Sequence, residues 1–291
     1  MTLVVGEATA QGPRLVSDTK IYFPGATHIG YDRGALKLVV LHHELAVGFA
    51  GDVAVALDAV RAIHGRQLDG APNVPQVLRI LEEASTGGRR EAEFLVATGD
   101  GSLARVRHGR SEVGLDDAWI GDPRAFSRFQ EARLASDPVW ASLTSDLDLA
   151  SGTERMAVLG RAMRTVIDSD DVDSVGDFCV CVAYGDRGFE YLESTFVYVG
   201  RDFVVDQHRD LIGQMAQSVE DGGFSVSVLE PANPGVAALG LSFPQARLAM
   251  MLLPLEFHEV QVLRDVGPNE FADAVRDRFG VEMKPPLLRH S

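Results

Sequence analysis

Short apolar runs separated by turn-forming residues fill the first two thirds of the chain, and they predict paired strands. Glycine, proline and small polar residues between two apolar runs favour a hairpin turn. Such residues occur at Gln11-Gly12-Pro13, at His42-His43-Glu44 and at Gly99-Asp100-Gly101. The predicted strand pairs are residues 3–10 with 14–18, 37–41 with 45–49, 93–98 with 102–107, and 178–184 with 189–192.

Apolar residues spaced three and four positions apart predict helices between these hairpins. The first helix should begin after Gly51, with Asp52 near its N-cap. The others should cover about 75–84, 123–135 and 153–168, and a short strand is predicted at 118–121. This order of elements indicates an α+β fold in which most strands pair with near neighbours in the sequence.

The last third of the chain has strand and helix patterns of its own, but no motif that carries chemistry. Its predicted strands are 196–199, 237–241, 247–253 and 259–263, and its predicted helices lie near 206–219 and 268–279. We therefore divide the chain into a core, residues 1–195, and an α/β extension, residues 196–291. The extension should pack on the core or mediate assembly, and a separate small domain is the alternative.

Composition and charge narrow the class of protein. The 291 residues are 46% hydrophobic and 24% charged, as in ordinary globular proteins, and the net charge is −15. A nucleic-acid partner is not expected, because a phosphate backbone would be repelled. No signal peptide or membrane-spanning run is predicted, so we expect a cytoplasmic protein without membrane contact.

The cysteines and histidines do not predict a metal or cofactor. Cys179 and Cys181 lie two positions apart on a predicted strand, a spacing that does not easily form a disulfide, so reduced thiols are expected. Two cysteines do not complete a zinc site, and a metal at His42-His43 would need a third ligand that the sequence does not place.

The candidate chemistry begins at Thr2. Removal of Met1, which is common when a small residue follows, would leave a threonine with a hydroxyl and a free α-amine in one residue. An α-amine with a pKa of about 8 can act as the base for the hydroxyl. Asp18 and Lys37 follow at the edges of predicted strands, where the lysine could lower the proton affinity of Thr2 and the aspartate could hold the lysine.

This ordered set resembles the proteasome β-subunit and HslV family of N-terminal-nucleophile hydrolases. In that family an initial threonine is followed by an aspartate, a lysine and an Ala-Gly turn that starts a helix. Here the series is Thr2, Asp18, Lys37 and then the stretch from Ala46 to Asp52. The resemblance covers residues 2–195 and implies a four-layer αββα sandwich.

The resemblance also implies roles for individual residues. Thr2 would attack the scissile carbonyl, Lys37 would lower the pKa of Thr2, and Asp18 would hold Lys37. The Gly51 amide would stabilise the oxyanion at the start of a helix. Phe49 would form the base of the first specificity pocket and favour small or apolar substrate side chains.

Two positions depart from the family pattern. A family serine that supports the N-terminal amine is replaced by Asp122, and a carboxylate there would raise the pKa of the amine. Further on, Asp173 matches a family aspartate of the site, but Gly176 stands where a serine is expected. The frame therefore matches while two supporting hydroxyl groups are missing.

The first hypothesis for function is an N-terminal threonine peptidase in a ring-shaped homo-oligomer that hides its nucleophiles. Its substrates would be peptides or proteins, and an ATP-dependent unfoldase is a possible partner. The second hypothesis is a non-catalytic member that serves as a scaffold or binding ring. A third is a hydrolase of small amides on the same fold.

Overall fold

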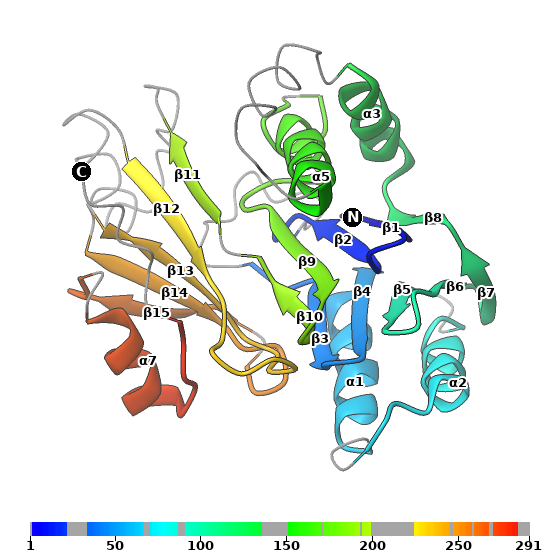
Figure 1. Cartoon of the computed structure of the whole chain (residues 1–291), viewed down its shortest axis with the longest axis horizontal. Coiled ribbons are helices and arrows are strands. Elements are labelled where there is room, and N and C mark those ends of the chain that lie inside the picture. The colour runs from blue at the N-terminus through cyan, green and yellow to red at the C-terminus, as the bar shows by residue number, and fades with distance from the viewer. Residues whose placement is uncertain are drawn as a thin grey trace.

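Three five-stranded antiparallel sheets and the helices packed against them make up the described part of the chain, a mixed α+β fold (Figure 1). This computed structural model describes residues 2–21, 34–66, 70–86, 91–135, 151–169, 171–192, 194–198, 224–244, 247–257, 259–267 and 270–284. The predicted helix near 206–219 lies outside these ranges.

The first sheet has the strand order β10-β9-β2-β1-β8. Its strands are β1 (Leu3–Glu7), β2 (Arg14–Ser17), β8 (Asp117–Gly121), β9 (Val180–Gly185) and β10 (Gly188–Tyr191). β1 lies between β2 and β8, with Val4 opposite Ser17 and Leu3 opposite Gly121. The beginning of the chain is therefore held between two neighbouring strands.

The second sheet has the strand order β3-β4-β5-β6-β7. Its strands are β3 (Leu38–His42), β4 (Leu45–Gly51), β5 (Ala92–Thr98), β6 (Leu103–Arg107) and β7 (Arg110–Leu115). β7 was not predicted from the sequence. It is an edge strand with mostly exposed side chains, so it lacks the apolar face that makes a strand recognisable.

Each of these sheets is covered by helices on one face and contacts the other sheet with its opposite face. The helices are α1 (Val53–His64), α2 (Val74–Ala84), α3 (Pro123–Leu134) and α5 (Ser151–Ile167). α1 and α2 pack on the second sheet, whereas α3 and α5 pack on the first (Figure 1). Between the sheets, Val4 and Ile120 pack with Leu38 and Leu95. Fully burying such a side chain stabilises the fold by about 1.5–3 kcal/mol.

The third sheet has the strand order β11-β12-β13-β14-β15. Its strands are β11 (Ser194–Tyr198), β12 (Phe224–Leu229), β13 (Leu239–Phe243), β14 (Leu248–Leu252) and β15 (Gln261–Arg264), and α7 (Phe271–Phe279) follows. Leu241 and Met250 join the apolar core between the first two sheets, whereas Met251 packs with Phe271 of α7. The sheet is therefore covered on both faces. The division of the chain at residue 195 stays a prediction.

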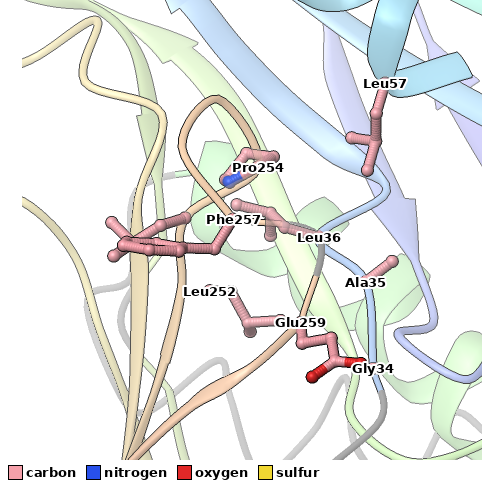
Figure 2. Close-up of a pocket in the computed structure, with 9 residues that line it drawn as sticks. Gly34, Ala35, Leu36, Leu57, Leu252, Pro254, Phe257 and Glu259 are labelled. Atoms are coloured by element: carbon pink, nitrogen blue, oxygen red, sulfur yellow. The ribbon is translucent and has the colours of Figure 1, made fainter. Parts of the chain in front are cut away.

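The loop between β14 and β15 contacts the segment that leads into Lys37. Arg61 of α1 donates hydrogen bonds to the carbonyl oxygens of Pro254 (3.0 Å) and Leu255 (3.2 Å). Figure 2 shows a small pocket between this loop and the segment before Lys37. Residues 34–36 and Leu57 line one side of it, and the other side is lined by Leu252, Leu253, Pro254, Phe257 and Glu259.

Candidate active site

Thr2 lies directly before β1, and its main chain is fixed by β8. The Asp122 amide donates a hydrogen bond to the Thr2 carbonyl oxygen at 2.8 Å. The approach is possible because residue 121 is a glycine: its φ is +103°, and a Cβ there would lie 2.0 Å from the Thr2 oxygen. Gly121 thus sets the position of Thr2 at the end of the sheet.

Asp18 and Lys37 reach Thr2 from two different sheets. Asp18 directly follows β2 in the first sheet, and Lys37 directly precedes β3 in the second. All three side chains are buried, with exposed fractions of 3% for Thr2, 0% for Asp18 and 2% for Lys37. The three predicted residues therefore meet where the two sheets face each other.

Lys37 is the centre of the hydrogen-bond network. Its Nζ donates to Asp18 Oδ2 at 2.8 Å, to Thr2 Oγ1 and to the Lys20 carbonyl oxygen. Thr2 Oγ1 in turn donates to Asp18 Oδ1. An ammonium group has three protons, so these three acceptors use all of them. The Thr2 hydroxyl is held between a lysine and a carboxylate.

Backbone amides orient the Asp18 carboxylate. Oδ1 accepts a hydrogen bond from the Leu3 amide, and Oδ2 accepts from the amides of Lys20 and Gly176, each at 3.2 Å. These donors come from β1, from the segment after β2 and from the segment before β9. Because the donors are main-chain groups, the carboxylate orientation depends on the fold and little on other side chains.

Burial controls the charge state of Lys37. Desolvation lowers its pKa, because the ammonium form loses its hydration in the interior, and Lys20 lowers it further. The negative charges of Asp18 and Asp177 act in the opposite direction and raise it. Lys37 therefore gives up its proton more easily than a solvated lysine.

A pocket opens beside Thr2 and brings in the other predicted residues. It is lined by Thr2, Lys20, Ile21, Lys37, Phe49, Ala50, Gly51 and Val53. Phe49 is buried, whereas Gly51 is exposed and lies just before α1 with a φ of +92°. Asp52 caps α1 by accepting a hydrogen bond from the Val55 amide. Phe49 and the start of α1 thus share one pocket with the Thr2 hydroxyl.

Asp173 is the remaining predicted residue of the site. It is exposed, and none of the hydrogen bonds found within the described residues joins it to Thr2, Asp18 or Lys37. Its role in the site stays a prediction. The main-chain amide of Gly176, in the same segment, makes the contact with Asp18 instead.

Asp122 has a partner that sequence reasoning missed. Its Oδ2 accepts a hydrogen bond from Ser174 Oγ at 2.5 Å, and its Oδ1 accepts from the Arg124 and Ala125 amides at the start of α3. Burial acts to raise the Asp122 pKa, but the hydrogen bonds from Ser174 and the two amides outweigh it and lower the pKa. A hydroxyl group is thus present near Asp122. It belongs to Ser174, whereas the resemblance predicts a serine at position 176.

The remaining residues carry no further predicted chemistry. Cys179 and Cys181 are free thiols with their Sγ atoms 3.9 Å apart. Within the described residues, no group of three His, Cys, Asp or Glu side chains could hold a metal ion. No helix in the same part of the chain is long and apolar enough to cross a membrane.

Comparison with known proteins does not assign the chain to a family: no protein-family model matches it, and no curated protein matches it.

Proposed function

We propose that this chain is an N-terminal threonine hydrolase, acting as a peptidase on a proteasome-like αββα sandwich. The observation that carries the proposal is the buried contact of Lys37 Nζ with both Thr2 Oγ1 and Asp18. Burying a lysine and an aspartate costs several kcal/mol per ion before their attraction is counted. Apolar side chains would fill the same space more stably, so a chemical role explains these residues better than a structural one.

The packing of helices and sheets supports the same proposal. α1 and α2 cover one sheet, α3 and α5 cover the other, and the two sheets share an apolar core. We interpret this arrangement as the four layers of the sandwich, with the third sheet and α7 as the extension. The site would then lie at one end of the inter-sheet core.

In the proposed reaction, Thr2 Oγ1 attacks the carbonyl carbon of an amide bond. Its proton passes to the α-amine of mature Thr2, directly or through a water molecule, and then to the leaving amine as the C–N bond breaks. Lys37 lowers the proton affinity of the hydroxyl that it contacts. The Gly51 amide, at the start of α1, stabilises the oxyanion. Water then hydrolyses the ester and restores the Thr2 hydroxyl.

The wider setting of the proposal depends on the family resemblance. It comprises peptide or protein substrates, a ring-shaped homo-oligomer in the cytoplasm and an ATP-dependent unfoldase as a partner. Asp122 in place of a supporting serine and the exposed position of Asp173 favour a second candidate, a non-catalytic scaffold with the same fold.

Intact mass and covalent labelling of the full-length protein distinguish these two functions. The threonine hydrolase should lack Met1 and should bind one molecule of a β-lactone probe at Thr2. Thr2→Ala should abolish labelling, whereas Thr165→Ala, an exposed threonine on α5, should not. Retention of Met1 throughout a native preparation, or absence of labelling, would refute catalysis by Thr2.

A further inference from the structure

Asp177 is a residue near Thr2 to which the proposed reaction gives no role. Its φ is +65°, in the left-handed region that L-residues other than Asn and Asp rarely adopt. The neighbouring amides are both bonded: Gly176 N donates to Asp18 Oδ2 at 3.2 Å, and Phe178 N donates to Thr19 Oγ1 at 3.1 Å. The surrounding structure therefore holds Asp177 in this conformation, against the end of β2.

Asp177 is half-buried, and it directly follows Gly176, whose amide donates to the same Asp18 oxygen, Oδ2, that accepts from Lys37 Nζ. The charges that act on Asp177 are those of Asp18 and Lys20, in the segment after β2, and of Lys37, in the segment before β3. The Lys20 side chain crosses over Gly176: a Cβ on Gly176 would lie 2.7 Å from Lys20 Cδ and 3.5 Å from Lys20 Nζ. The main chain of Asp177 thus lies beside the Asp18–Lys37 pair, and its carboxyl group is the second one in this region.

The effect of these charges is mutual. Burial, and next the negative charge of Asp18, raise the pKa of Asp177 to about 7, while Lys37 and Lys20 oppose the shift. Asp177 in turn raises the pKa of Lys37. Since Asp177 changes charge near neutral pH, it can alter the electrostatics of Thr2 under physiological conditions.

We propose that Asp177 is a positioning residue of the Thr2 site, whose carboxyl group sets the net charge around Lys37 and through it the proton affinity of Thr2. When Asp177 is neutral, two ammonium groups and one carboxylate leave the cluster positive. When it is ionised, the charges cancel. The positive cluster lowers the proton affinity of the Thr2 hydroxyl and amine. The catalytic part of this inference depends on the proposed function, but the charge coupling does not.

The coupling is tested by thermal unfolding at pH values between about 5 and 8.5. The folded-state pKa of Asp177 is raised, so its stabilising contribution is present at low pH and is lost as the pH rises through about 7. The melting temperature of Asp177→Asn, relative to wild type, should therefore increase with pH. Asparagine can adopt the left-handed backbone conformation of Asp177, so this variant should fold. Asp177→Gly is a second variant without the carboxyl group, and glycine adopts this conformation readily.

Two further variants sharpen this measurement. Asp186→Asn, an exposed residue in the turn between β9 and β10, should follow the wild-type pH dependence. Lys20→Met should move the transition to higher pH, because it removes a charge that lowers the Asp177 pKa. Identical pH dependence in wild type and in both Asp177 variants would overturn the proposal.

The effect on Thr2 is tested by the pH dependence of β-lactone labelling. Asp177→Asn should move the labelling midpoint to lower pH by about one unit, as expected for removal of one nearby negative charge. An unchanged midpoint, with an altered stability profile, would show that Asp177 does not act on Thr2 and would overturn the proposal. If wild type is not labelled at any pH, the proposed function fails, and the stability measurements alone decide the coupling.

Discussion

Replacing Gly121 with alanine should displace Thr2 without removing any hydrogen-bonding group of the site. The new Cβ would lie 2.0 Å from the Thr2 carbonyl oxygen. The end of β8 and the segment of Thr2 must therefore separate by more than about 1 Å to reach an ordinary van der Waals contact. The positive φ costs alanine about 1–2 kcal/mol, and such overpacking typically costs about 1–3 kcal/mol more. We expect a total loss of about 2–5 kcal/mol in the free energy of unfolding.

Gly101→Ala is the matched control for this change. Its φ is +91°, close to that of Gly121, but a Cβ there would meet no atom within 4 Å. Urea denaturation should therefore show only the backbone cost, about 1–2 kcal/mol. A nucleophile displaced by about 1 Å can lose about 10²-fold in rate, so β-lactone labelling of Gly121→Ala should slow on that order. Equal stability of the two variants, with wild-type labelling in both, would refute the role of Gly121.

Three further predictions follow from the site and the extension. Lys37→Met should reduce labelling of Thr2 by about 10³-fold or more, measured with folding confirmed by circular dichroism; a wild-type rate would remove Lys37 from the mechanism. Arg61→Ala should lower the free energy of unfolding by about 1–3 kcal/mol, because it leaves the Pro254 and Leu255 carbonyls without a donor; an unchanged urea midpoint would contradict this. Light scattering should give a closed oligomer, and a monodisperse monomer with full activity would exclude the ring.

The elements with strong local signals were predicted from the sequence. The start of α1 is an example: Asp52 was expected near the N-cap, and its side chain does accept from the Val55 amide. β12 (Phe224–Leu229) was missed, although its apolar residues alternate with serines as in a half-buried strand. β7 offered no comparable signal, because most of its side chains are exposed at a sheet edge.

Some residues of the candidate site were likewise predicted from the sequence, and others were not. The resemblance of an ordered set of residues to a known family selected Thr2, Asp18 and Lys37, and the structure brings these three side chains together. The same resemblance named Asp173 and gave no role to Ser174 or Asp177, because the sequence does not show the directions of these neighbouring side chains. Those directions depend on packing against β2 and α3, and on the left-handed φ of Asp177, none of which has a local sequence signal.

The hydrogen bond between Gly176 and Asp18 joins residues 158 positions apart, which bears on when the site can form during synthesis. Thr2 leaves the ribosome early, but Gly121, Asp122 and Gly176 follow much later. Contacts between such distant residues form late, because the intervening chain must first be ordered. In the proposed hydrolase, a nascent chain would therefore expose Thr2 before the Gly176 amide orients the Asp18 carboxylate. In the proposed hydrolase, this long sequence separation would delay activation until most of the fold exists, and would so protect the growing chain from cleavage by Thr2.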